Sequence, residues 1–167
     1  MEQEKLINEK KIWLFEQIKS EYAAMAKKNR IFFWIFCAIF GIFLIEVILQ
    51  LTGVLEPFDK EELLSNFIFY AGLLLGALYS KIATNKMAKA ETPEGLLVTY
   101  DKIKKIGVWA FVVVIALLVI SVILKYGFSN THTFISWLIL VCILMALLVA
   151  YNRNNQIKKL RELVQKS

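Results

Sequence analysis

Long apolar runs alternate with charged stretches along the chain. Four of these runs are about as long as the roughly 20 residues that a helix needs to cross the hydrocarbon core of a bilayer. We place them at about 31–52, 63–83, 106–126 and 133–151. The pattern predicts an all-α polytopic membrane protein with four transmembrane helices arranged as two tandem two-helix hairpins. Hydrophobic residues make up 58% of the chain, against about 45–50% in soluble domains, which agrees with this class.

The cationic residues lie almost entirely in the three segments that we assign to one side of the membrane. Residues 1–30 hold seven Lys and Arg, residues 80–105 hold six and residues 152–167 hold five, so that these segments contain 18 of the 20. Because cytoplasmic loops retain Lys and Arg, we expect both termini to be cytoplasmic. The net charge of +6 then reflects topology and a lipid partner, anionic headgroups at the cytoplasmic face, and requires no nucleic acid.

The predicted domains follow from these two patterns. A cytoplasmic amphipathic helical arm covers 1–30, a four-helix transmembrane domain covers 31–151 with a cytoplasmic connection at about 84–105, and a basic tail that forms a short helix covers 152–167. The first apolar run is longer than the core of a signal peptide and follows thirty largely polar residues, so we expect no cleaved signal. The Lys-rich and Ile-rich composition favours a bacterial inner membrane.

An internal repeat supports the tandem hairpins. Residues 27–49 and 102–124 align at an offset of 75 with eight identities in 23 positions, among them Trp34 with Trp109 and a shared Ile-x-Val-Ile-Leu ending. Apolar segments also resemble one another by composition, so gene duplication is one of two explanations. Two hairpins of the same orientation would be related by a pseudo-twofold axis along the membrane normal.

Two helix starts carry capping signals. Thr92 precedes Pro93, and Thr at the N-cap with Pro at the first helical position predicts a helix from about Pro93 through the third span. Asp59 and Glu62 have the spacing of a capping box and predict the start of the second span.

The arm carries an apolar stripe outside the bilayer, with Lys and Glu on its other faces. Its members are Ile7, Leu14, Phe15, Ile18, Tyr22 and Met25. Three different surfaces could bury this stripe. The first is the chain itself, through the lead-in of the third span and the tail residues Ile157, Leu160 and Val164. The second is a partner protein or another copy, and the third is the membrane surface.

Small residues recur every four positions in the second span, at Gly72, Gly76 and Ser80. In lipid such a strip lets helix backbones approach closely, so we expect it to be a helix-packing face, within one chain or between copies.

Few residues are suited to chemistry. The chain has one histidine, His132, and its two cysteines, Cys37 and Cys142, lie inside apolar spans without a CxxC motif. We find no catalytic constellation, phosphate loop or metal-binding motif. We therefore expect a protein that is not an enzyme and that needs no cofactor.

One acidic residue, Glu46, lies inside the first span, in its outer half. An ionised side chain is costly in the membrane, which makes an intramembrane acid a candidate functional residue. Gln50, Ser121 and Ser136 are polar residues that we place at similar depth. Together the four form a candidate polar or ion site. The alternatives are a structural contact of Glu46 with Lys125, Ser136 or another copy, and an acid that reaches toward the headgroups.

Two classes of function remain. We favour a non-enzymatic membrane subunit that forms a homo-oligomer and recruits, anchors or regulates a cytoplasmic protein partner, as sensors, immunity proteins and assembly factors do. The alternative is a small ion channel or transporter that uses Glu46. The third and fourth spans offer few polar groups to line an ion path, which weakens the alternative unless several copies surround a pore.

Overall fold

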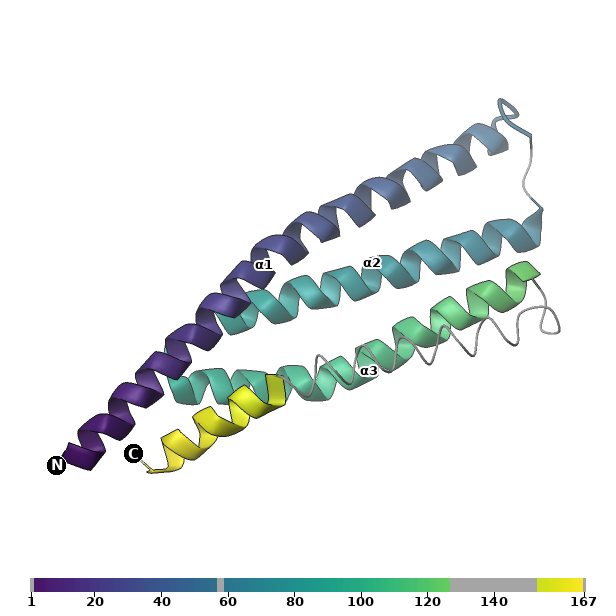
Figure 1. Cartoon of the computed structure of the whole chain (residues 1–167). Helices are drawn as coiled ribbons and strands as arrows, with labels where there is room; N and C mark the ends of the chain where they lie inside the picture. The colour runs from purple at the N-terminus through teal and green to yellow at the C-terminus, as the bar shows by residue number, and fades with distance from the viewer. Residues whose placement is uncertain (1, 57–58, 127–152, 167) are drawn as a thin grey trace.

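A computed structural model describes residues 2–56, 59–126 and 153–166, and every regular element in these residues is helical. Three long helices, α1 (Glu2–Leu51), α2 (Lys60–Ala88) and α3 (Pro93–Tyr126), are followed by a helical segment over 153–166 (Figure 1). All three are long and apolar enough to cross a membrane, which supports an integral membrane protein. The predicted fourth span at 133–151, with Ser136, lies outside the described residues. The tandem hairpins and the duplication therefore stay predictions.

Helix α1 joins the predicted arm and the first span without a break. Its 50 residues extend over about 75 Å at 1.5 Å per residue. It ends where Gly53 adopts a positive φ of 73°. The Gly53 N–H donates to the Gln50 carbonyl at 3.0 Å and the Val54 N–H to the Leu49 carbonyl at 2.9 Å, which is a Schellman motif.

The starts of α2 and α3 were predicted with different success. As predicted, α3 begins at Pro93, and the Gly95 N–H donates to the Thr92 Oγ1 at 3.0 Å. Asp59 is the N-cap residue of α2, but its side chain makes no capping hydrogen bond, so the predicted capping box is wrong on this point. The Glu62 carboxylate instead lies 3.5 Å from Lys125 Nζ of α3, because α3 brings a cation to this end of α2.

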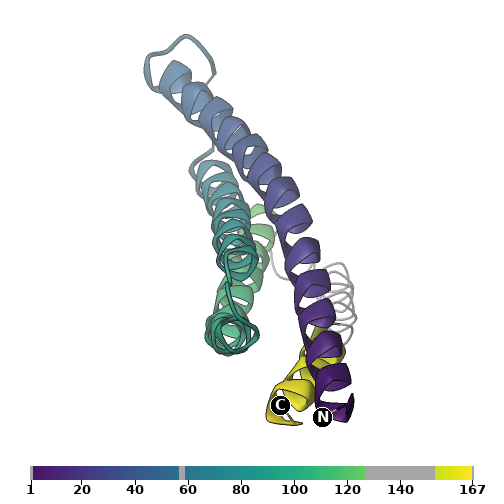
Figure 2. The same ribbon diagram turned by 90° about the vertical axis from the view of Figure 1, so that its left-hand side faces the viewer.

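Helix α2 lies between α1 and α3 and makes most of the interhelical contacts (Figure 1). Glycines make its approach to α3 close, since a Cβ on Gly72 would lie 3.3 Å from the Leu117 Cβ. Toward α1 the contacts include aromatic pairs, with the rings of Phe43 and Tyr70 at 5.1 Å between centroids. Figure 2 shows α1 running beside the pair formed by α2 and α3.

The main hydrophobic core lies beyond the apolar spans, at the end of the molecule where the two described chain ends lie together (Figure 1). We call it the terminal cluster. It consists of Leu14, Phe15, Ile18 and Tyr22 of α1, Met87 of α2, Ala90 of the α2–α3 turn, Leu96 and Leu97 of α3, and Ile157 and Leu160 of the 153–166 segment. Four helical segments and the α2–α3 turn are therefore held together outside the spans predicted from the sequence.

The terminal cluster accounts for the apolar stripe of the arm. The predicted docking face of Ile7, Leu14, Phe15, Ile18, Tyr22 and Met25 is largely covered by the chain itself: its four central residues are buried, and Ile7 and Met25 are half-buried. The intramolecular alternative describes the structure, because the start of α3 and the 153–166 segment reach the stripe. These four central residues are not available to a partner.

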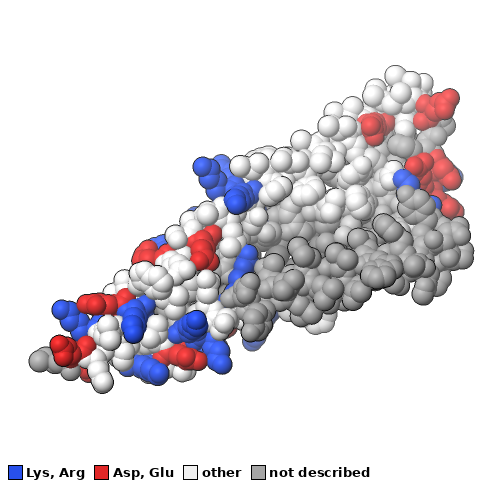
Figure 3. All heavy atoms as spheres, in the orientation of Figure 1, with Lys and Arg blue, Asp and Glu red and all other residues white. Residues whose placement is uncertain are grey.

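Charged side chains divide between the two ends of the molecule (Figure 3). Lys and Arg, mixed with some acids, gather toward the end that holds the terminal cluster. Acids dominate the opposite end, where Glu56, Asp59 and Glu61 are exposed. The described surface between them is largely uncharged in this view. Trp34 and Trp109, which belong to the predicted first and third spans, are 60% and 73% exposed. This is the surface expected of helices that face lipid.

Candidate functional site

The candidate site is a cavity of about 540 Å³ between α2, α3 and the 153–166 segment, with Tyr22 of α1 also in its wall. We call it the interhelical cavity. Its apolar part is lined by Gly76, Ala110, Phe111 and Val114, within the candidate spans of α2 and α3. Its polar part is lined mainly by Tyr22, Tyr79, Ser80, Thr84, Tyr100, Lys104, Arg153 and Asn154. The cavity is thus amphipathic along its length, with the polar part toward the terminal cluster.

Arg153 is a cation of the cavity whose position is defined by two contacts with α1. Its guanidinium lies 5.6 Å from the centre of the Tyr22 ring and donates to the Met25 Sδ at 2.8 Å. Among the described residues it forms no ion pair with a carboxylate. A guanidinium has five N–H donors, and a thioether is a weak acceptor. Arg153 therefore retains the capacity to bind an anion.

Tyr79 is positioned by an unusually close approach to α3. Its hydroxyl donates to the Ile103 carbonyl at 2.7 Å. A Cβ on Gly107 would lie only 2.5 Å from the Tyr79 Oη, so a glycine at 107 makes room for this hydrogen bond. The Gly107 position was not singled out from the sequence, because a single glycine in an apolar helix carries no signal of its contact.

Tyr22 and Tyr100 complete the polar part with neutral hydroxyls. Burial raises the pKa of Tyr22 above its usual 10.0, against the opposing effect of Arg153. Burial likewise raises the pKa of Tyr100, and Arg153 again opposes it. The Tyr100 hydroxyl donates to the Asn154 Oδ1. The Asn154 side chain thus ties α3 to the 153–166 segment through its oxygen, and its –NH₂ group remains a potential donor to the cavity.

A polar contact between α1 and α2 borders the cavity. The Asn29 side-chain nitrogen donates to Ser80 Oγ at 2.8 Å and to Thr84 Oγ1 at 3.3 Å. Of the predicted packing strip, Gly72 and Gly76 therefore face α3, whereas Ser80 binds α1. Sequence reasoning missed Asn29 because it precedes the first span among charged residues and looked like part of the solvated arm.

The described structure gives the surroundings of three of the four residues in the predicted intramembrane polar site. Glu46 is exposed on α1 and Gln50 is half-buried one turn further on. Ser121 is buried against Ser65 of α2, and Ser136 lies outside the described residues. Glu46 therefore faces outward from the bundle, and the described residues contain no group of His, Cys, Asp or Glu placed to hold a metal ion.

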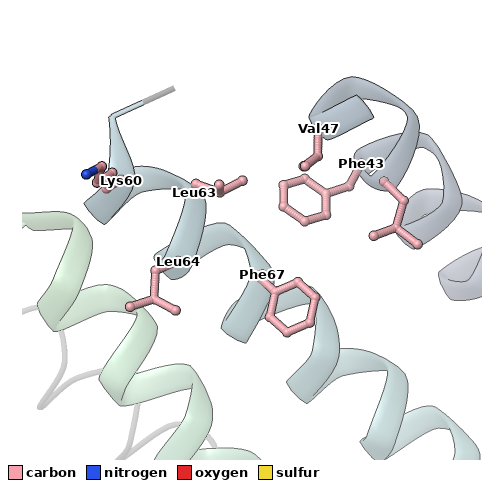
Figure 4. A pocket seen from close by; sticks show the side chains of 7 residues that line it. Phe43, Val47, Lys60, Leu63, Leu64 and Phe67 are labelled. Atoms are coloured by element: carbon pink, nitrogen blue, oxygen red, sulfur yellow. The ribbon is translucent and has the colours of Figure 1, made fainter. Parts of the chain in front are cut away.

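A second hollow, of about 380 Å³, lies between α1 and α2 near the opposite end. Phe43 and Val47 of α1 face Leu63 and Phe67 of α2 across it (Figure 4). Lys60 lies at its edge, at the start of α2. The hollow offers apolar surface to lipid chains but few groups that could select a ligand.

Comparison with known proteins gives no match to any protein-family model, curated protein or solved structure. Function must therefore be inferred from the geometry of the chain itself.

Proposed function

We propose that this protein is a non-enzymatic integral membrane subunit that self-associates and recruits, anchors or regulates a cytoplasmic protein partner through its helical arm. The proposal places it in a bacterial inner membrane with both termini in the cytoplasm. Sensors, immunity proteins and assembly factors act in this way.

The exposed face of the arm is the observation that carries this proposal. Leu6, Ile12 and Trp13 are 51%, 50% and 67% exposed on α1, on the side away from the terminal cluster. An exposed tryptophan on a rigid helix is a common anchor of protein interfaces, because it brings a large contact area with little loss of conformational freedom. The terminal cluster supplies the rigidity, since it fixes the same turns of α1 from the other side.

The charge of the arm favours a protein partner over the lipid surface. Residues 2–24 hold five glutamates and four lysines. Helices that lie on anionic membranes usually carry an excess of Lys and Arg on their polar face. The exposed face of the arm includes Glu9 and Glu16 beside Trp13, and these carboxylates would be repelled by an anionic leaflet.

The cytoplasmic orientation rests on the cations and on the terminal cluster together. The cluster joins α1 to the 153–166 segment, which supports a common side for both termini. The three segments that hold 18 of the 20 Lys and Arg include both of these ends, and the positive-inside rule favours the cytoplasm for them.

Self-association is supported by Glu46. A carboxyl group exposed on the apolar part of α1 is costly in lipid, and a polar contact with another helix lowers that cost. A contact between copies through this face of α1 would bring two such groups together. The same outward position is the observation that favours the alternative, an ion channel or transporter, in which several copies would arrange Glu46 around a pore.

Purification of the full chain from native membranes in a mild detergent tests the proposal. We expect a second protein in fixed ratio with the wild type, lost with Trp13→Ala and retained with Ser20→Ala. Ser20 is the matched control, because it is exposed on the same face of the arm and its replacement removes no apolar surface. A homo-oligomer with no second protein in all three preparations would contradict recruitment and favour the channel.

A further inference from the structure

The interhelical cavity combines two properties that an amphipathic anion requires. Its polar part carries Arg153 and Lys104, and none of the described residues that line it is Asp or Glu. Its apolar part continues between α2 and α3 along Gly76, Ala110 and Val114. A volume of about 540 Å³ falls within the roughly 300–1,000 Å³ of small-molecule sites.

Two acids adjacent in sequence to residues that line the cavity, Asp101 beside Tyr100 and Glu21 beside Tyr22, are engaged elsewhere. Asp101 accepts two hydrogen bonds from Arg161, at 2.8 and 2.9 Å. Glu21 accepts from Gln17 at 3.2 Å and from Gln156 at 3.4 Å. The positive charge of Arg153 and Lys104 is therefore not cancelled by a carboxylate of the described chain, and it faces the cavity.

The expected depth of the cavity in the membrane indicates the source of the anion. Lys104 lies two residues before the predicted third span, and Arg153 lies two residues after the predicted fourth span. Both cations are thus expected at a membrane–water interface, the depth of lipid phosphates, while Gly76 and Val114 lie inside the predicted second and third spans. Basic pockets between transmembrane helices are known to hold lipid headgroups in this arrangement.

We propose that the interhelical cavity is a binding site for one anionic phospholipid, with its phosphate on Arg153 and Lys104 and the upper part of an acyl chain against Gly76, Ala110 and Val114. The guanidinium donates to the phosphate oxygens, in preference to the thioether of Met25. The Asn154 –NH₂ group is a further donor beside it. The lipid would join α2, α3 and the 153–166 segment, and so would stabilise the elements that also form the terminal cluster. The site is independent of the partner protein proposed for the arm.

Retention of added lipid by the full-length protein in detergent, read by native mass spectrometry together with the thermal unfolding temperature, tests the site. The probes are phosphatidylglycerol, phosphatidylcholine and inorganic phosphate. We expect phosphatidylglycerol alone to be retained and to raise the unfolding temperature. With Arg153→Gln combined with Lys104→Gln, we expect its binding to weaken at least about tenfold, since the two cations that hold the phosphate lose their charge.

A matched control distinguishes binding of the lipid in the cavity from its general attraction to positive surface charge. Lys105→Gln combined with Lys158→Gln removes the same charge from the same two helical segments, at exposed positions outside the cavity, and we expect at most a twofold change. An equal loss in this control, or equal retention of phosphatidylcholine, would overturn the proposal. If inorganic phosphate raised the unfolding temperature as much as phosphatidylglycerol does, the cavity would be a site for free anions, and the proposal would also be overturned.

Ala110→Phe tests the apolar part without any change of charge. We expect it to reduce lipid retention, because the larger side chain occupies the space between α2 and α3. If the glutamine variants do not fold, Arg153→Lys replaces them in the lipid-binding test. It keeps the positive charge but loses the paired N–H donors of the guanidinium, so we expect an affinity for phosphatidylglycerol between those of the wild type and the glutamine variants. Wild-type affinity in both variants would contradict the site. Trp13→Ala should leave lipid binding unchanged, so that this test and the test of the partner fail separately.

Discussion

Ser65 of α2 and Ser121 of α3 exchange hydrogen bonds between side chain and backbone. The Ser65 hydroxyl donates to the Ser121 carbonyl at 2.7 Å, and the Ser121 hydroxyl donates to the Ser65 carbonyl at 2.9 Å. Both residues are buried, at 1% and 3% exposure. The reciprocal pair fixes the register of α2 on α3 near the end of the spans remote from the terminal cluster.

Replacing either serine of this pair should weaken the contact between α2 and α3. We expect Ser65→Ala and Ser121→Ala each to lower the free energy of unfolding by about 0.6 kcal/mol, with an upper limit of about 1.7 kcal/mol for a hydrogen bond between membrane helices. Denaturation of the purified protein in mixed detergent micelles measures the loss. Ser20→Ala, on the exposed face of the arm, is the control and should be neutral. Losses that simply add in the double variant would argue against mutual dependence of the two bonds.

Gly107→Ala should destabilise the protein by about 1–3 kcal/mol, the usual cost of an overpacked position, because the new methyl group collides with the Tyr79 hydroxyl. In a Tyr79→Phe background the same substitution should cost clearly less, since the colliding oxygen is gone, and a double-mutant cycle measures this coupling. Gly41→Ala is the control, because nothing lies within 4 Å of its Cβ position. Equal costs at 41 and 107 would contradict the close approach.

Leu96→Ala should open the terminal cluster. Leu96 is 0% exposed, and removing a buried leucine side chain costs about 2–5 kcal/mol. The arm and the 153–166 segment should then become sensitive to protease and exchange amide hydrogens faster, while the candidate spans stay protected. Val98→Ala serves as a control on the same turn of α3, because Val98 is 55% exposed. Unchanged protection of the arm in Leu96→Ala would show that the cluster does not hold it.

The terminal cluster should weaken in alkali. Burial raises the pKa of Tyr22 and Tyr100 in the folded state above 10.0, so folding favours their neutral hydroxyls. This contribution is complete below the unfolded-state pKa of about 10 and is lost as the pH rises through the higher folded-state pKa.

Phenylalanine at both tyrosine positions should remove this part of the pH dependence. At neutral pH the double variant should be about 1 kcal/mol less stable, because it lacks the hydrogen bond from Tyr100 to Asn154. Its deficit relative to the wild type should shrink as the pH rises above about 10. The lysines also titrate in alkali, but both proteins contain them, so their effect on stability cancels in the difference between the two. Parallel stability curves for the two proteins would rule out the tyrosines as the titrating groups.

Orientation can be tested by labelling cysteines in sealed cells, after Cys37 and Cys142 have been replaced by alanine. Glu56→Cys should react with a membrane-impermeant maleimide from outside. Gln3→Cys and Lys166→Cys should react only after the membrane has been opened, because the positive-inside rule keeps both ends in the cytoplasm. All three positions are exposed. Reaction of position 56 from the same side as position 3 would overturn the topology.

The sequence by itself predicted the helices and several of their ends. A chain in lipid must satisfy its backbone hydrogen bonds within each span, so a long apolar run has few alternatives to a helix. Local chemistry also determined the start of α3, where Thr92 and Pro93 need no distant residue to cap a helix. At Asp59 the same reasoning predicted where α2 starts but not the absence of a capping hydrogen bond from the Asp59 side chain. It also could not predict the ion pair of Glu62 with Lys125 of another helix.

Only the tertiary structure decided which faces meet. The stripe around Ile18 was equally suited to a partner, to the membrane or to the chain's own end, since an apolar face does not specify what covers it. The Ser65–Ser121 pair and the position of Arg153 over Tyr22 join residues 56 and more than 100 positions apart, and no local pattern encodes such contacts. Helix formation depends on neighbours along the chain, whereas the buried core and the interhelical cavity depend on how those helices cross.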